Sequence, residues 1–186
     1  MSANIFSEPD KEILDRRGTI VEHLACLVSS DGLITDRDEC RAYETDALAV
    51  YRRIPLAVVL PTSTDEVRAV LKFCHDNGVK VVPRGAGTSL AGGAIPTEDA
   101  IVLGLSRMSR VLEINYDDRF IRVEAGVTNL SITSAVSDRG FFYAPDPSSQ
   151  LACTIGGNIA NNSGGAHCLK YGVTTNNLLG IRLVLI

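Results

Sequence analysis

Two glycine-rich stretches restrict the fold of this 186-residue sequence more than any other feature. Of its 16 glycines, five lie within residues 85–104 and four lie within residues 156–165. Glycine adopts positive φ readily and lets a ligand approach the main chain, so the backbone N–H groups of such a stretch can converge on one anion. The two stretches therefore indicate either a ligand site or a pair of ordinary tight turns.

The residues that precede the first stretch have the pattern of a β-α-β unit. Residues 56–60 (LAVVL) form a short apolar run that predicts a buried strand, and residues 79–82 predict the next strand. Between them, Ser63 and Glu66 have the spacing of a capping box, and Gly78 is placed to end the helix. The apolar face of this helix is predicted to comprise Val67, Val70, Leu71 and Cys74. We expect the two strands to be parallel.

The N-terminal residues are predicted to lie outside the main domain. Residues 1–18 are a charged lead-in, and residues 19–30 have the periodicity of a helix. The apolar face of that helix is predicted to comprise Ile20, Leu24, Leu27 and Val28. We therefore assign residues 1–39 to a helical lead-in and residues 40–186 to the main domain.

Short apolar runs alternate with turns beyond the first glycine-rich stretch. Strands are expected at residues 101–105, 111–114 and 120–124, with a hairpin turn at residues 115–118 between the last two. Thr128 is placed to cap a helix that continues to Arg139 and ends at Gly140. The pattern predicts a mixed α+β domain.

The last part of the sequence is predicted to be mostly irregular. Residues 141–143 are expected to be extended, and residues 145–165 to form a long polar loop, which in a compact domain is often functional. The final run IRLVLI, residues 181–186, predicts a buried strand. Because a natural domain rarely stops inside its own strand, we expect the coding sequence to continue past Ile186.

Composition excludes several classes of function. The net charge of −4 and the sequence pI near 5.4 do not predict the basic surface that nucleic-acid binding needs. No apolar run approaches the roughly 20 residues that span a bilayer, so we expect no direct membrane insertion. The five cysteines include no C-x-x-C pair, which disfavours a disulfide framework and favours a reducing cytosol.

The first glycine-rich stretch is chemically suited to a pyrophosphate. Besides its glycines it offers the hydroxyl groups of Thr88 and Ser89 and the charge of Arg84. It is not a dinucleotide fingerprint, because Leu90 stands where that pattern needs its last glycine. It is not a P-loop either, because no lysine lies between Arg84 and Ala94. If it binds phosphate, it does so as a different kind of loop.

The second stretch combines glycine with short polar side chains. Hydrogen bonds to a ribityl chain or to a ring edge are available from Ser148, Ser149, Thr154, Asn158, Asn161 and Asn162. A long surface loop with ordinary turns is the alternative. His167 shortly afterwards either approaches the same ligand or is a hydrogen-bonded structural histidine.

Four motifs in a fixed order resemble a known family. They are P-R-G-A-G-T-S-L-A-G-G-A at residues 83–94, Y-A-P-D-P-S-S-Q at 143–150, I-G-G-N-I-A-N-N-S-G-G at 155–165 and H-C-L-K-Y-G at 167–172. Together they resemble the FAD-linked oxidases of the vanillyl-alcohol oxidase and p-cresol methylhydroxylase (PCMH) type. Within that family they are most similar to the flavin subunit of glycolate oxidase and to D-lactate dehydrogenases. The resemblance covers residues 40–186.

The resemblance implies a PCMH-type FAD-binding fold of two α/β subdomains, of which the second is truncated at Ile186. It implies that FAD pyrophosphate is held by Arg84, Gly85, Ala86, Gly87, Thr88, Ser89, Gly92 and Gly93. It implies that the rest of the flavin is lined by Asp146, Ser149, Cys153, Thr154, Gly156, Gly157, Asn158, Asn162, Gly164 and Gly165. Some relatives attach flavin through a histidine where this sequence has Thr88, so we expect noncovalent FAD.

The family also sets expectations for the whole protein. The glycolate oxidase and D-lactate dehydrogenase branch implies oxidation of a small 2-hydroxy acid such as glycolate or D-lactate. Members of the family are more than twice as long as this sequence, and their catalytic and metal-binding histidines lie in a substrate domain beyond the position of Ile186. No catalytic or metal-binding residue is therefore assigned here, and we expect residues 1–186 alone to bind FAD weakly or not at all. Companion subunits are implied, one with iron–sulfur clusters, together with a cytoplasmic location and peripheral attachment to the inner membrane through them.

Three other interpretations stay open from the sequence. The chain fits a cell-wall sugar reductase of the same flavin superfamily, although residues 145–149 and 167–172 favour the hydroxy-acid branch. It also fits an accessory, non-catalytic subunit of an oxidase complex with the same fold. The last interpretation is a nucleotide-binding module that takes ADP-type ligands without flavin.

Overall fold

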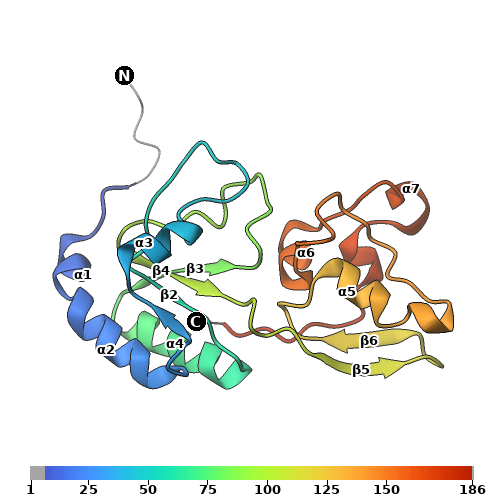
Figure 1. The fold of residues 1–186 in the computed structure, drawn as a ribbon, viewed down its shortest axis with the longest axis horizontal. Helices are drawn as coiled ribbons and strands as arrows, with labels where there is room; N and C mark the ends of the chain where they lie inside the picture. The colour runs from blue at the N-terminus through green and yellow to red at the C-terminus, as the bar shows by residue number, and fades with distance from the viewer. Residues whose placement is uncertain (1–6, 186) are drawn as a thin grey trace. The chain divides into compact units, whose positions relative to one another are not determined.

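The computed structural model describes residues 7–185, which form two compact units (Figure 1). Within the described residues, the first unit comprises residues 7–83, 90–104 and 184–185, and the second comprises residues 84–89 and 105–183. The first glycine-rich stretch is therefore divided between the units, because residues 84–89 belong with the second half of the chain.

A four-stranded sheet organises the first unit. Its strands follow the order β1 (Leu33–Ile34), β2 (Ala57–Val59), β4 (Ala100–Gly104) and β3 (Lys80–Arg84). β2 pairs in parallel with β4 and antiparallel with β1. All of β2 and β4 is buried, which explains why both strands are continuous apolar runs in the sequence. The predicted β-α-β unit forms, but β4 lies between its two strands, so they are not neighbours.

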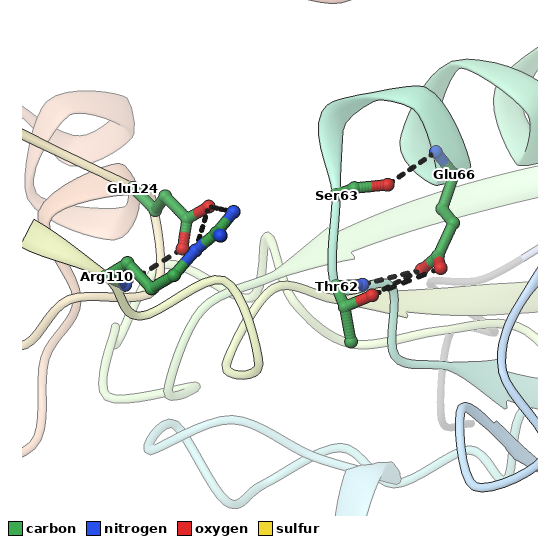
Figure 2. Close-up of polar contacts among 5 residues, drawn as sticks. All are labelled: Thr62, Ser63, Glu66, Arg110 and Glu124. Carbon is green, nitrogen blue, oxygen red and sulfur yellow. Dashed lines mark hydrogen bonds and ion pairs between the residues drawn. The ribbon is translucent and has the colours of Figure 1, made fainter. Parts of the chain in front are cut away.

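Helix α4 (Thr64–Asp76) connects β2 to β3 and has the predicted ends. The Ser63 hydroxyl accepts the Glu66 N–H at 3.2 Å, while the Glu66 carboxylate accepts the Thr62 N–H at 2.6 Å (Figure 2). In a capping box the Glu66 carboxylate would accept the N–H of Ser63, but here it accepts the N–H of the preceding residue, Thr62. At the other end Gly78 has a φ of +70°, and the Val79 N–H donates to the Cys74 carbonyl at 2.9 Å, as in a Schellman motif.

The N-terminal segment contributes to the sheet unit. It contains α1 (Lys11–Asp15), α2 (Arg17–Leu27), β1, α3 (Arg37–Cys40) and the 3₁₀ helix η1 (Arg41–Tyr43). Ile20 and Leu24 on α2 are buried as predicted. Arg17 donates to the backbone carbonyls of Leu56 at 3.2 Å and Thr35 at 2.5 Å. Because β1 lies within residues 1–39 and Arg17 bonds to Leu56, the segment expected to be a lead-in supplies an edge strand of the sheet and a bond to the main domain.

The second unit is built on the predicted hairpin. β5 (Val111–Asn115) and β6 (Phe120–Val123) pair antiparallel, with a bulge between Val111 and Glu113. Next to the hairpin, Arg110 donates to both oxygens of the buried Glu124 carboxylate, through its backbone N–H at 2.8 Å and its guanidinium at 2.7 Å (Figure 2). The shorter elements are α5 (Asn129–Ser134), η2 (Ser137–Arg139), α6 (Ile155–Asn161), α7 (Cys168–Tyr171) and η3 (Thr174–Asn177).

Three elements predicted for the C-terminal half of the sequence are wrong. The helix from Thr128 ends at Ser134 and is followed only by η2, because Val136 leaves helical geometry with a φ of −126°. The segment 155–161, expected to be irregular, forms α6. Residues 181–185 form no strand and have no partner strand among the described residues, and their apolar side chains are largely exposed; Ile186 lies outside the described residues. No helix within residues 7–185 is long and apolar enough to cross a membrane.

Candidate functional site

Within the second unit, the main chain of residues 85–87 in the first glycine-rich stretch lies against the side chains of Thr154 and Arg84. A Cβ added to Gly85 would lie 2.2 Å from the Thr154 hydroxyl oxygen, and one added to Gly87 would lie 2.1 Å from the Arg84 guanidinium. Gly87 also has a φ of +70°. Both positions therefore need glycine for space, and Gly87 needs it for conformation as well. Arg84 itself is 9% exposed, so its charge lies beneath the loop it precedes.

Residues 85–88 leave their backbone donors available. Among the described residues, no partner accepts a hydrogen bond from the N–H groups of Gly85, Ala86, Gly87 or Thr88. Ala86 is exposed, and the other three are only partly covered. Successive unbonded N–H groups beside a buried cation form the kind of concavity that binds an anion. This arrangement fits one of the sequence predictions, a loop that holds pyrophosphate.

Helix α6 does not offer a comparable anion site, because protein groups occupy the N–H groups of its first turn. The Ile155 N–H donates to the Val127 carbonyl at 2.8 Å, and the Gly156 N–H donates to the Ala125 carbonyl at 2.9 Å. The Thr154 hydroxyl accepts the Gly157 N–H at 3.3 Å. Since these donors are used internally, Gly156 and Gly157 provide close packing rather than free donors.

Asn158 carries polar atoms that the protein leaves without partners. Its side chain is 1% exposed, and within residues 7–185 neither its Nδ2 nor its Oδ1 has a hydrogen-bond partner. An unsatisfied buried amide costs about 1–3 kcal/mol, so such a group in a native protein calls for a ligand or water that satisfies it. Its neighbour Asn161 accepts a bond from the Ser89 hydroxyl at 3.1 Å, which joins the first loop to α6.

The remaining predicted residues of the second unit have structural partners. The Cys153 carbonyl accepts the Asn129 N–H at 2.9 Å, and the Ser149 carbonyl accepts the Cys153 N–H at 2.8 Å. Asn162 ends α6 with a φ of +47°, and its Oδ1 accepts the Thr175 N–H at 3.0 Å.

Two further predicted residues, Gly92 and Gly93, lie in the first unit. The Gly92 N–H donates to the buried Asp46 carboxylate at 2.9 Å, so this donor anchors the loop to its own unit. Gly93 is unconstrained, since a Cβ added there would meet nothing within 4 Å.

Asp146 has a partner that the sequence reasoning did not assign. Its Oδ2 lies 2.5 Å from His167 Nδ1, and its Oδ1 accepts the His167 N–H at 3.2 Å. The hydrogen bond from His167 lowers the pKa of Asp146. Gly165 lies beside the pair, because a Cβ added there would lie 1.9 Å from the Asp146 carbonyl oxygen. No local signal in the sequence links Asp146 to a histidine 21 positions later.

The residues of the second unit fit FAD on two observations of their own. The unbonded N–H groups of residues 85–88 match the charge of a pyrophosphate, and the unsatisfied Asn158 amide matches the donors and acceptors of a flavin ring edge. In the part of the chain that the structure describes, His, Cys, Asp and Glu form no group of three or more that could hold a metal ion.

Comparison of the sequence with known proteins finds a matching family and relatives named as oxidases or dehydrogenases. The family described as FAD binding domain matches residues 55–185. Glycolate oxidase subunit GlcD of Escherichia coli (strain K12) is 52% identical over 146 residues, which are 78% of this chain and 29% of that protein. D-lactate dehydrogenase of Archaeoglobus fulgidus is 40% identical over 149 residues, 80% of this chain and 33% of that protein. The chain thus spans about a third of the length of these relatives.

Solved structures share the fold. Alkyldihydroxyacetonephosphate synthase matches 93% of this chain and 34% of its own, with a TM-score of 0.76 and 22% identity. p-Cresol methylhydroxylase matches 83% of this chain and 30% of its own, with a TM-score of 0.69 and 19% identity. The α+β fold is therefore the PCMH-type FAD-binding fold, as predicted, and the chain belongs to the family described as FAD binding domain.

Proposed function

We propose that this chain is the FAD-binding part of an oxidoreductase that converts a small 2-hydroxy acid, glycolate or D-lactate, to the 2-oxo acid. The observation that carries the proposal is the group of free N–H donors at residues 85–88, joined through Ser89 to the helix that bears the unsatisfied Asn158 amide. The names of the relatives, glycolate oxidase subunit and D-lactate dehydrogenase, support the substrate class.

The residues of the chain have distinct tasks in this proposal. Residues 85–88 bind the pyrophosphate through backbone N–H groups, with the buried Arg84 charge offsetting its negative charge. Thr154 fixes the distance between the first loop and α6, because it touches Gly85 and caps the helix. Asn158 donates to and accepts from the flavin ring edge. When bound, FAD supplies the hydride acceptor of the oxidation. Thr88 offers no nucleophilic imidazole, so the flavin is held noncovalently.

The test uses the longest open reading frame that contains this chain. The purified protein is expected to carry FAD that acid denaturation releases, and anaerobic glycolate or D-lactate is expected to bleach the flavin absorbance. Bleaching by a reduced nicotinamide but not by hydroxy acids would support the sugar reductase instead. Bound FAD that no substrate reduces would indicate an accessory subunit. Binding of ADP without flavin would contradict the proposal altogether.

The proposal extends to partners. The relatives of Escherichia coli and Bacillus subtilis are named as subunits, which supports companion oxidase subunits for this protein. We expect one of these companions to be an iron–sulfur protein. Such partners would carry electrons away from the flavin and would attach the cytoplasmic protein to the periphery of the inner membrane. Copurification of the natively expressed protein with a polypeptide that contains iron and acid-labile sulfide is the expected result. A homogeneous protein without iron would contradict it.

A further inference from the structure

Two contacts join the segments on either side of residues 147–166, the second glycine loop, which lies between Asp146 and His167. The first is the bidentate contact of the Asp146 carboxylate with the backbone N–H and ring of His167. The second is an edge-on ring contact between Phe142 and Tyr171, with centroids 5.7 Å apart. One contact is polar and the other is aromatic, and they use different residues on each side. The rings of His167 and Tyr171 also contact each other, with centroids 6.5 Å apart, so the two contacts adjoin on the side that follows the loop.

The turn at residues 164–168 is fitted closely to this junction. The Gly165 N–H donates to Cys168 Sγ at 3.0 Å, and a Cβ on Gly164 would lie 2.3 Å from the same sulfur. Because neither Gly164 nor Gly165 has room for a side chain, the turn can bring the His167 N–H to Asp146. The His167 side chain is mostly exposed, so its contact with Asp146 alone stabilises the protein little. The significance of the pair lies in the geometry that it imposes.

The segment enclosed by the junction contains most of the residues expected to line the flavin beyond its pyrophosphate. Ser149, Cys153, Thr154, Gly156, Gly157, Asn158 and Asn162 all lie between Asp146 and Gly164. Closing the ends of a segment removes conformational freedom that a ligand would otherwise have to order on binding. Both Asp146 oxygens contact His167, so the Asp146 carboxylate holds the backbone and the ring of this residue in place.

We propose that His167 is a positioning residue: with Asp146 it closes the second glycine loop in the conformation that receives the flavin, and so sets the affinity for FAD. This inference rests on the proposed function for its ligand. The contact between Phe142 and Tyr171 supports the same closure from the other side of the junction.

The test compares variants that keep or remove one hydrogen bond, all made in the longest open reading frame that contains this chain. In His167→Asn the amide Nδ2 stands where Nδ1 stood, whereas in His167→Gln the amide is displaced toward the position of Nε2. We expect His167→Ala and His167→Gln to raise the Kd for FAD about threefold to fivefold, and His167→Asn to restore most of the affinity. Asp146→Ala is expected to act like His167→Ala, and the double variant to be no worse than either. Leu169→Ala, at a fully exposed side chain on α7, is the matched control and should leave the Kd unchanged.

A second measurement separates this inference from the proposed function. Hydrogen exchange of residues 150–163 without FAD should be faster in His167→Ala than in the wild type or His167→Asn. If the wild-type protein binds no FAD but exchange rises in this way, the proposed function fails while the closure of the loop stands. If FAD binds equally well to all variants, or if the effects of the two single alanine variants add in the double variant, the role of His167 is refuted.

Discussion

Arg84 and the two glycines that follow it have little room to change. The main chain at Gly87 passes over the guanidinium, and the main chain at Gly85 passes over the Thr154 hydroxyl. The two contacts differ, because the guanidinium is the end of a flexible side chain whereas Thr154 is buried and caps α6. A side chain at position 85 must therefore disturb the helix, while one at position 87 meets a movable group but an unfavourable φ.

Alanine substitutions should separate these cases. Gly85→Ala is expected to destabilise the protein by about 1–2 kcal/mol, because Thr154 must leave its capping position. Gly87→Ala is expected to cost about 1–2 kcal/mol through its left-handed backbone. Both should weaken FAD binding. Gly93→Ala is the control from the same stretch, with open space and no positive φ, and should change the free energy of unfolding by less than about 0.5 kcal/mol. Urea unfolding and FAD titration measure all three, and equal effects at positions 85 and 93 would refute the contact with Thr154.

A buried carboxylate in the first unit, that of Asp99, leads to a prediction about how stability depends on pH. Asp99 is fully buried, and its Oδ2 accepts bonds from Lys80 Nζ at 2.7 Å and from the Asp10 N–H at 2.9 Å. Burial acts to raise its pKa, but these hydrogen bonds and the Lys80 charge outweigh burial and lower the pKa to about 2.

Since this pKa lies below the value of about 3.9 in the unfolded chain, Asp99 stabilises the protein above that value. The stabilisation is lost as the pH falls through about 4 toward 2. Asp99→Asn should lower the free energy of unfolding by about 1–3 kcal/mol at pH 6. The difference between wild type and variant should shrink by pH 3, as followed by urea unfolding. A difference that is independent of pH would contradict the ionised pair.

Helix α4 illustrates what an element's own sequence can specify. Its start at Ser63, its buried face of Val67, Val70 and Cys74, and its end at Gly78 were all predicted, because each depends on residues within one or two turns. Burial of Cys74 raises its pKa to about 12, which agrees with a structural thiol that does not react.

The start of α4 can be tested by removing one cap at a time. Ser63→Ala should cost about 1 kcal/mol, because the Glu66 N–H loses its acceptor. Glu66→Gln keeps a side-chain oxygen for the Thr62 N–H but removes its charge from the first turn, so it should cost less, about 0.5 kcal/mol. Thermal unfolding followed by circular dichroism measures both. If Glu66→Gln proves the more harmful change, the negative charge of Glu66 contributes more to the start of the helix than the Ser63 cap does.

Helix α6 shows why other elements could not be predicted. Gly156 and Gly157 in its first turn lower the intrinsic preference for a helix, so the sequence favoured a loop. The helix forms because Thr154 caps it and because Ile155 packs with Val127 and Ile132, which come from distant parts of the chain. The same limit applies to β4, whose place between β2 and β3 depends on pairing and not on its own residues.

At the scale of the whole molecule, the candidate site was predicted as a list of residues but not as an arrangement. The glycine positions and the polar residues of the second loop could be read from motifs. The sequence could not show which of these polar groups lack a hydrogen-bond partner, because the partners of Asp146, Gly92 and Gly156 come from elsewhere in the chain. The free donors at residues 85–88 and the lone amide of Asn158 are known only once those other partners have been placed.

The apolar residues near the end of the described chain affect the behaviour of the molecule in solution. Ile181, Leu183 and Leu185 are 52%, 65% and 79% exposed. Neighbouring exposed apolar side chains favour association. The paired change Leu183→Ser and Leu185→Ser should reduce the binding of a hydrophobic dye and reduce light scattering, with little change in unfolding free energy. A large loss of stability would show that these side chains are packed in solution.

The division of the first glycine stretch between the two units has a consequence for biosynthesis. Residues 84–89 are translated in the middle of the sheet unit, but Thr154 and Asn161, which hold them, are made only after the hairpin and α5. Residues 84–89 therefore leave the ribosome before the side chains that support them have been synthesised. Folding in order of synthesis can complete the sheet, whereas the pyrophosphate loop must wait for the second unit. A nascent chain arrested before residue 154 should accordingly fold its sheet and yet leave residues 84–89 open to proteases.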